Sequence, residues 1–251
     1  MAAGGGTLQH ANVNVNDTAA AQRGARLFVN YCMSCHSASY MRYQRLATDL
    51  DLDEEAVMEN LVFSDAKIGD RMEIAMRPQD AAAWLGKAPP NLSLVARSRG
   101  TDWLYTYMRS FYRDDSKIIG VNNLVFPDVG MPHVLWELQG IQNPVYKYEV
   151  HHEGHAVESF DTEAAAEDFM KQQGEGYRLE RVVDHLELVE PGSMTSAEYD
   201  QVARDLATFL TYISETMKLE RQRMGVWVML FLVVFTVLAY LTKKEWWKDI
   251  H

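Results

Sequence analysis

The sequence predicts a mainly α-helical protein with a small α+β insertion and one C-terminal transmembrane helix. Three observations predict this fold class. Apolar residues recur at helical spacing over 199–213, and residues 224–242 form a run of 19 without a charge. The segment 141–190 contains stretches with the composition of β-strands on both sides of one helical stretch. The 251 residues are 47% hydrophobic and 24% charged, a composition typical of a folded protein.

The N-terminal residues 1–16 are small and polar. They contain no basic start followed by an apolar run, so no secretory signal is visible, and we expect an exported form to have lost its signal already. Asn16 and Asp17 are expected to cap a helix over 18–31, whose apolar positions fall on one face. That helix would lead directly into the first of the two cysteines.

Short helices and loops are expected between the cysteines and residue 140. Helices are predicted at 49–61, 80–85 and 101–112, and the second is stopped by Gly86 and a Pro-Pro pair. Residues 114–130 carry a loop signature of Gly, Asn and Pro.

The segment 141–190 is interpreted as an α+β insertion. Strands are predicted at 145–150, 157–160 and 177–189, with a helix at 162–172. A Glu-Gly turn separates the first two strands.

The last part of the chain predicts a capped amphipathic helix followed by a membrane anchor. Thr195 and Glu198 form a capping box in front of the helix. At ~1.5 Å per residue, the uncharged run 224–242 covers the ~30 Å hydrocarbon core of a bilayer. Lysines and tryptophans follow it, as at a lipid interface. We therefore divide the chain into a soluble domain, 1–217, and an anchor with a short tail, 218–251.

Cys32-Met33-Ser34-Cys35-His36 is a Cys-x-x-Cys-His motif, the attachment signature of a c-type haem. Two thiols about one turn apart bond to the vinyl groups of the porphyrin, and the adjacent imidazole points at the iron. A thioredoxin-like pair would follow a strand rather than a helix, and structural zinc would need two more ligands at comparable spacing. The sequence thus predicts one covalent haem c on Cys32 and Cys35, with His36 as an axial iron ligand.

The second axial ligand must come from the 13 Met or the other seven His residues. Most Met residues at helical spacing fill cores. Met131 lies between Gly and Pro, where no helix can turn its thioether away, and Met76 is the alternative. A Met ligand raises the reduction potential relative to a second His. The other conspicuous histidines are expected to be loop or turn residues: His133, His151, His152, His155 and His185.

Covalent haem attachment also predicts the compartment, because c-type haem is assembled on the outer side of an energy-conserving membrane. We expect the domain 1–217 in the periplasm, the span in the lipid of a bacterial inner membrane, and the C-terminus in the cytoplasm. The positive-inside rule does not decide the orientation, since three basic residues precede the span and three lysines follow it.

Taken together, the haem motif, the Gly-Met-Pro at 130–132 and the single C-terminal span resemble the cytochrome c1 family, the haem subunits of cytochrome bc1 complexes. Further matches are Ala-Pro-Pro-Asn-Leu-Ser at 88–93 and Pro-Gly-Ser-Met at 191–194. The resemblance covers two stretches, roughly 22–140 and 191–241. Residues 141–190 match no part of the family pattern. Some members also carry a disulfide, which cannot form here because the chain has no cysteines outside the haem motif.

The resemblance implies a cytochrome c-like haem domain with Met131 as the second axial ligand. It also implies that Arg99 pairs with a haem propionate and that Trp103 stands near the propionates, where the family usually has a Tyr. The expected function is the passage of single electrons from a Rieske iron–sulfur protein to a cytochrome c within a respiratory quinol–cytochrome c reductase. Cytochrome b and Rieske subunits, a cytochrome c acceptor and a dimeric complex are the implied partners.

Two other classes of function stay open. One is a free-standing membrane-anchored cytochrome c shuttle or oxidase subunit, and the other is a haem-based ligand sensor with a labile sixth site. Quinol oxidation is expected to belong to other subunits, because the sequence carries neither the Cys/His set of a Rieske centre nor several spans with paired His for b haems. An independent enzyme such as a peroxidase is not expected, because the sequence has only one haem motif.

The net charge of −11 argues against a nucleic-acid partner, which would need a basic face. Residues 218–251 carry six Lys or Arg against three Asp or Glu, and residues 1–217 carry 18 against 32. The soluble domain is therefore the acidic part. Its charge would speed encounter with a basic cytochrome c, and the candidate patches are 49–55 and 158–190.

Overall fold

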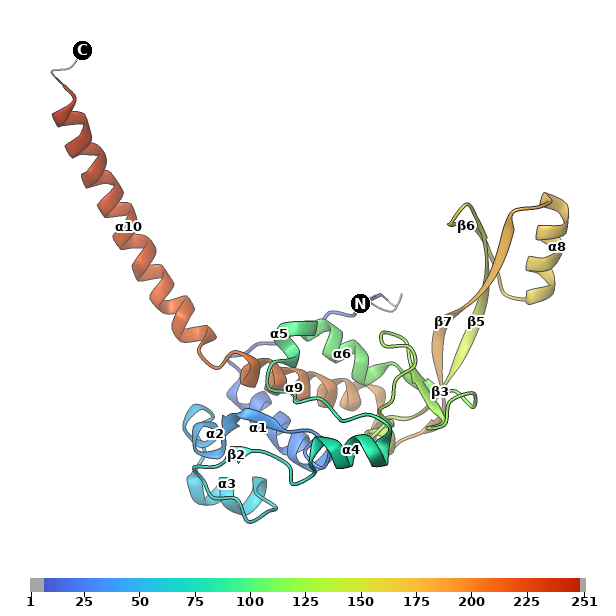
Figure 1. Ribbon diagram of the computed structural model, residues 1–251, viewed down its shortest axis with the longest axis horizontal. Coiled ribbons are helices and arrows are strands. Elements are labelled where there is room, and N and C mark those ends of the chain that lie inside the picture. The colour runs from blue at the N-terminus through green and yellow to red at the C-terminus, as the bar shows by residue number, and fades with distance from the viewer. Residues whose placement is uncertain (1–6, 249–251) are drawn as a thin grey trace.

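The computed structural model describes residues 7–248. The first six residues and the last three lie outside the described part, and with them the start of the polar N-terminal segment and the end of the expected cytoplasmic tail. Figure 1 shows a body of short helices from which two long projections leave at opposite ends. One is helix α10 (Lys218–Trp246), and the other is an arm built on strands β5 (Gly140–His152) and β7 (Tyr177–Pro191).

Helices α1 (Thr18–Leu27) and α9 (Ser196–Ser214) cross at the centre of the body. The predicted cap of α1 is confirmed, since the Asp17 carboxylate accepts a hydrogen bond from Ala20 N at 2.9 Å. The crossing is tight at Gly24, where a Cβ atom would overlap the backbone carbonyl of Asp205 and lie 2.7 Å from Phe209 Cβ. A glycine is therefore required where the two backbones approach.

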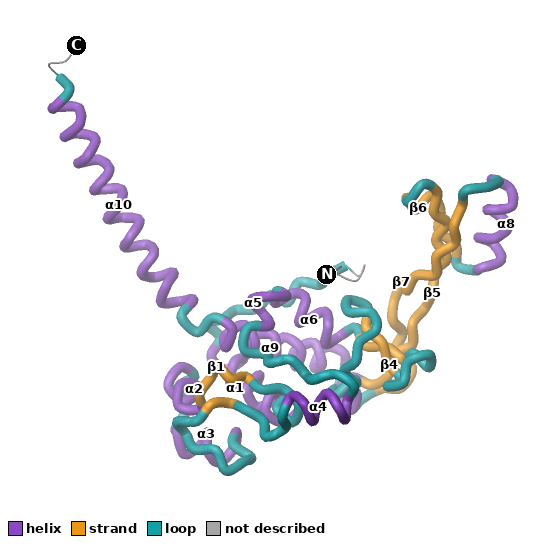
Figure 2. The backbone as a smooth tube through the Cα atoms, viewed as in Figure 1, coloured by secondary structure: helices purple, strands orange, loops and turns teal. Residues whose placement is uncertain are grey.

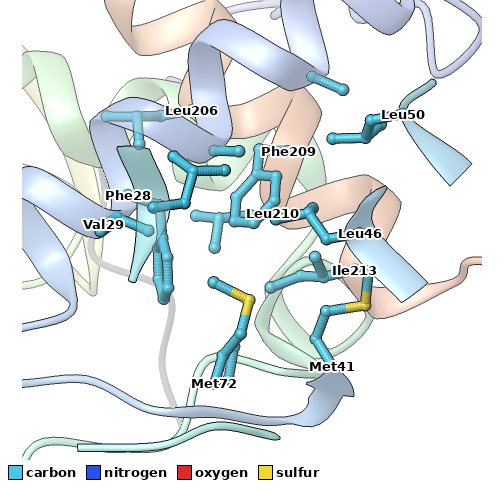
Figure 3. Packing of buried hydrophobic residues seen from close by; sticks show 14 of the residues in the cluster. Phe28, Val29, Met41, Leu46, Leu50, Met72, Leu206, Phe209, Leu210 and Ile213 are labelled. Carbon is cyan, nitrogen blue, oxygen red and sulfur yellow. The ribbon is translucent and has the colours of Figure 1, made fainter. Parts of the chain in front are cut away.

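The main hydrophobic core lies under this crossing. The Phe28 and Phe209 rings stand 5.3 Å apart, centroid to centroid, and both side chains are fully buried. Side chains from β1 (Ala38–Arg42), α2 (Tyr43–Asp49) and β2 (Arg71–Met72) close the core from the other side, as Figure 3 shows for Met41, Leu46 and Met72.

The predicted helix 18–31 changes its winding before it reaches the cysteines. After Leu27 the backbone continues as a π-helical turn, η1 (Phe28–Cys32), in which Met33 N donates to Phe28 O at 2.9 Å. Single π-helical turns are rare and are frequently found at functional sites.

The segment between the cysteines and the arm is made of short elements, several of which the sequence did not predict. Their bounds are β1 (Ala38–Arg42), α2 (Tyr43–Asp49), α3 (Glu54–Leu61), β2 (Arg71–Met72), α4 (Pro78–Leu85), α5 (Val95–Arg99), α6 (Thr101–Arg109), β3 (Phe111–Arg113), β4 (Val121–Asn123) and α7 (Trp136–Gln139). β1 pairs with β2, and β3 pairs with β4, both antiparallel.

Two of the predicted helices have wrong boundaries. The helix expected at 49–61 is interrupted, because Asp51 adopts a left-handed backbone conformation with φ of 53° between α2 and α3. The helix expected at 101–112 ends at Arg109, and the chain continues as β3 because β4 offers it a partner strand. The helix predicted at 80–85 is confirmed and begins two residues earlier, at Pro78.

The arm contains the predicted strands and helix, and its strands are longer than predicted. β6 (His155–Phe160), β5 and β7 form an antiparallel sheet in that order, and α8 (Glu163–Gln173) packs against it. The predicted Glu-Gly turn joins β5 to β6, with positive φ at Glu153 and Gly154, as a two-residue type I′ hairpin turn requires. Figure 2 shows that the arm consists largely of β-strands. The prediction of a mainly α-helical fold is therefore confirmed only in part.

The C-terminal region agrees with the sequence prediction. The capping box of Thr195 and Glu198 is present at the start of α9. After α9 ends at Ser214, α10 contains a candidate membrane span, Glu220–Trp246, in which an 18-residue window has a mean hydropathy of 2.5 and no buried side chains. Figure 1 shows α10 leaving the body as a single long helix. By length and composition it can cross a membrane.

We expect Gly24→Ala to lower the free energy of unfolding by about 1–3 kcal/mol, because the added methyl group forces α1 away from α9. Chemical denaturation of the detergent-solubilised protein, followed by far-ultraviolet circular dichroism, measures the change. The matched control is Gly69→Ala, whose new Cβ meets no atom within 4 Å and should change the stability by less than about 0.5 kcal/mol. Equal effects of the two substitutions would contradict the importance of the crossing.

Candidate functional site

The two cysteines and the histidine of the motif lie on one turn at the end of η1. Cys35 N donates to Cys32 O at 3.1 Å, and His36 N donates to the same oxygen at 2.9 Å. Both cysteines are free thiols and half-buried. Burial, with a smaller contribution from Cys35, raises the pKa of Cys32 to about 12, so this thiol stays protonated at neutral pH.

The imidazole of His36 has a fixed tautomer. Its Nδ1 lies 2.7 Å from the carbonyl oxygen of Pro90, and a carbonyl oxygen can only accept, so Nδ1 carries the proton. Nε2 is then the nitrogen with a free lone pair, as in metal-binding histidines whose other nitrogen is hydrogen-bonded. Burial lowers the pKa of His36, and the bond to Pro90 opposes this only in part.

Pro90 gains its role only in the folded protein. It belongs to the Pro-Pro motif, for which sequence reasoning found a resemblance but no contact. Two hydrogen bonds hold the segment beside the haem motif: Leu92 N donates to Ser37 O at 2.9 Å, and Asn91 Nδ2 donates to Ser39 Oγ at 2.6 Å. Two free thiols on one turn and an imidazole with an available Nε2 fit a c-type haem.

Met131 lies in the loop after β4, half-buried, and its sulfur has a hydrogen-bond partner. Tyr107 Oη on α6 donates to Met131 Sδ at 3.4 Å. Burial raises the pKa of Tyr107, so the phenol keeps its proton. Sequence reasoning missed Tyr107, because a tyrosine in an aromatic-rich helix carries no signal of its own.

Arg99 and Trp103 belong to the same group of side chains as Tyr107. The guanidinium of Arg99 lies 5.2 Å from the ring centroid of Trp103 and 5.5 Å from that of Phe126. Trp103 stacks on Tyr107 at 4.8 Å with an interplanar angle of 14°. The structure thus connects Arg99, Trp103 and Met131 through Tyr107 and Phe126.

This aromatic group and the haem motif border the same hydrophobic core. Trp103, Cys32 and Met33 all pack, partly buried, against the core around Phe28. The alternative ligand Met76 lies half-buried between β2 and α4, and the described part of the chain provides no hydrogen bond to its sulfur.

His152 and His155 are paired across the β5–β6 hairpin, but the histidines of the arm otherwise have different neighbours. His151 lies 3.2 Å from Glu149 and 3.6 Å from Glu180, whereas His152 stacks on Tyr177 at 4.5 Å. Among residues 7–248, no group of three or more His, Cys, Asp or Glu side chains is arranged to hold a metal ion. His133 stacks on Phe111 at 4.9 Å, and burial lowers its pKa to about 4.

Two adjacent asparagines hold the segment that carries Met131, and sequence reasoning treated them only as a loop signature. Asn123 is fully buried; its Nδ2 donates to Tyr107 O at 2.8 Å and its Oδ1 accepts from Val125 N at 3.1 Å. Asn122 Oδ1 accepts from Asp128 N at 2.9 Å. A consecutive Asn pair in a loop was the available signal, since Asn side chains commonly bond to nearby backbone.

Comparison with known proteins identifies the family. The model of the cytochrome c1 family matches residues 9–250, which is nearly the whole chain. The chain belongs to the cytochrome c1 family.

Individual relatives also match this chain over nearly its whole length. A cytochrome c1 of Allochromatium vinosum is 47% identical, over 100% of this chain and 93% of the relative. A protein of Nitrosomonas europaea named ammonia monooxygenase gamma subunit is 39% identical, over 97% of this chain and 89% of the relative. A cytochrome b/c1 of Bradyrhizobium diazoefficiens is 27% identical, over 94% of this chain and 34% of that longer protein.

Members of the cytochrome c1 family are membrane-anchored haem subunits of the cytochrome bc1 complex and carry one covalently bound haem c. This membership implies cytochrome b and Rieske iron–sulfur partners for the chain. It favours an electron-transport role over a free-standing shuttle, an oxidase subunit or a ligand sensor. It also explains the apolar α10 as the family's C-terminal anchor.

We expect Asn123→Ala to lower the free energy of unfolding by about 1–3 kcal/mol, because it leaves the Val125 N–H without its partner and removes one of the two donors to Tyr107 O, the other being Ser110 N. Denaturant titration of the purified protein measures the change. Asn60→Ala is the control: this exposed side chain bonds only within its own helix, and its loss should cost less than about 0.5 kcal/mol. A neutral Asn123→Ala would show that the asparagine does not hold the loop.

Proposed function

We propose that the Cys32 and Cys35 thiols carry the haem c as thioethers, and that His36 and Met131 are the axial ligands of its iron. The observation that carries this proposal is the 2.7 Å hydrogen bond from His36 Nδ1 to the Pro90 carbonyl. It supports the assignment because it leaves Nε2 as the coordinating atom.

Bound haem supplies one-electron chemistry at its iron. The chain's own residues fix the ligands and set the reduction potential. A thioether from Met131 favours the reduced state relative to a second imidazole. Met131 is preferred to Met76 because Tyr107 already holds the Met131 sulfur at 3.4 Å.

Arg99 and Trp103 form the proposed propionate side of the site. No acidic side chain of the described residues forms an ion pair with Arg99, whereas Arg97 lies 3.8 Å from Glu215. A guanidinium without a carboxylate partner suits an anionic propionate. Its contacts with the Trp103 and Phe126 rings fix where the charge lies.

The proposed orientation places the domain 1–217 in the periplasm and the C-terminus in the cytoplasm of a bacterial inner membrane, with the insertion 141–190 on the periplasmic side. Its support is the chemistry of haem attachment together with the single span, Glu220–Trp246. We place the chain in a dimeric complex on the family relationship alone.

The proposed electron acceptor is a basic cytochrome c. The soluble domain carries a large acidic excess, which would steer a cationic partner. Figure 1 shows α3 on the side of the body away from the direction in which α10 and the arm project. Glu54 and Glu55 lie at the start of α3, whereas Asp49 accepts a hydrogen bond from Tyr212 of α9 and lies nearer the junction with α10. We choose the acidic stretch 49–55 over the arm as the docking face.

We expect Met131→Leu to abolish the near-infrared Met-to-iron band and to lower the reduction potential, because leucine offers no sulfur. Absorption spectroscopy and redox titration of the purified complex measure both. The denatured variant should still give the alkaline pyridine spectrum of covalent haem, since Cys32 and Cys35 are unchanged.

Met76→Leu is the matched control and should keep both the band and the potential. If the band survives in Met131→Leu and disappears in Met76→Leu, the ligand assignment is wrong. If the denatured wild-type protein shows no covalent haem, the whole site assignment is wrong.

We expect the rate constant for reduction of a basic cytochrome c to fall about tenfold or more as added salt screens the acidic face. Stopped-flow mixing of the reduced complex with cytochrome c at increasing ionic strength measures this rate constant.

The double variant Asp51→Asn, Glu55→Gln should lower the rate constant at low salt. Glu163→Gln, Glu167→Gln makes the same charge change on α8 and should not. A rate constant that does not change with ionic strength would contradict electrostatic steering. If the α8 variant lowers the rate constant more than the 51/55 variant does, the docking face lies on the arm.

A further inference from the structure

The sulfur of Met131 has a second partner available besides iron. A thioether sulfur carries two lone pairs, and coordination uses only one of them. In this structure Tyr107 Oη lies 3.4 Å from Met131 Sδ, with the hydroxyl as donor, within the range of a sulfur hydrogen bond. One sulfur atom can therefore bind iron and accept this hydrogen bond at the same time.

The ring of Tyr107 is fixed on several sides. Trp103 stacks on it at 4.8 Å, Phe111 meets it edge-on at 5.0 Å, and Phe126 meets it edge-on at 6.5 Å. Its backbone carbonyl accepts from the buried Asn123. A ring held on these sides keeps its hydroxyl in one place, so the hydrogen bond costs little further ordering.

The segment that carries Met131 rests on the same aromatic group. Phe111 contacts Tyr107 on one side and stacks on His133 on the other, with a ring separation of 4.9 Å and an interplanar angle of 5°. His133 is two residues from Met131. Hydroxyl and sulfur are therefore positioned by one shared packing unit rather than by two independent elements.

We propose that Tyr107 is a positioning residue that tunes the Met131 sulfur through this hydrogen bond and thereby raises the reduction potential of the site. The proposal rests on the assignment of Met131 as an axial ligand. A hydrogen bond to sulfur withdraws electron density from it. Ferric iron depends more on ligand donation than ferrous iron does, so the hydroxyl destabilises the oxidised state relative to the reduced one.

Tyr107→Phe is the deciding variant, because it removes the hydroxyl and keeps the ring. We expect the near-infrared band to persist and the potential to fall. The expected shift corresponds to a change of up to about tenfold in the reduction equilibrium constant, or about 59 mV for one electron. Redox titration of the intact membrane complex, followed at the c-type haem absorption, measures it.

Two further variants separate the hydroxyl from packing. Tyr107→Leu removes both the hydroxyl and the ring and should shift the potential in the same direction as Tyr107→Phe. Tyr105→Phe is the matched control on the same helix. Tyr105 is buried, its ring lies against Arg109 and Arg204, and removal of its hydroxyl should leave the potential unchanged.

An unchanged or raised reduction potential in Tyr107→Phe overturns the proposal. If only Tyr107→Leu shifts the potential, the effect comes from ring packing and the proposal is also overturned. The proposal is likewise overturned if Tyr105→Phe shifts the potential as much as Tyr107→Phe does. These outcomes differ from a failure of the ligand assignment. If Met131→Leu keeps the near-infrared band, Met131 is not the ligand and both proposals fail. If it loses the band while Tyr107→Phe changes nothing, only the role of Tyr107 fails.

Discussion

The close crossing of α1 and α9 at Gly24 is the constraint from which the rest of the molecule follows. Helix α1 continues into the π-helical turn that ends at Cys32, so the crossing fixes where the haem motif begins. Helix α9 leads into the membrane helix α10, and Glu215 at the junction pairs with Arg97 of α5 and Arg221 of α10. One packing contact thereby ties the haem motif to the membrane anchor.

The proposed ligands are held by partners from elsewhere in the chain. The Pro90 carbonyl that orients His36 lies 54 positions away in the sequence, and the Tyr107 hydroxyl at the Met131 sulfur lies 24 positions away. Both partners act on a ligand and not on the iron. The Pro90 contact leaves Nε2 of His36 free to coordinate, and the Tyr107 contact holds the Met131 sulfur in place, as outer contacts do at other metal sites.

Features with a local physical cause were predicted correctly from the sequence. The Asp17 cap, the Thr195 and Glu198 capping box and the hairpin turn at Glu153 and Gly154 each depend on residues within a few positions of one another. Features that need a distant partner were missed or misjudged. The strands β1 to β4 are short and are extended only because they pair with one another. The helix expected at 101–112 ends at Arg109, because the residues that follow it pair with β4 as strand β3.

By itself, the sequence determined the haem motif, the apolar span and the family. Cysteine spacing is fixed by the covalent chain, and an uncharged run of 19 residues is a property of composition. The tertiary structure alone decided that Pro90 orients His36 and that Tyr107 reaches Met131. Those contacts require two atoms brought within about 3.5 Å by helices and loops far apart in the chain. No local pattern of residue types encodes that distance, because it is set by how the core packs.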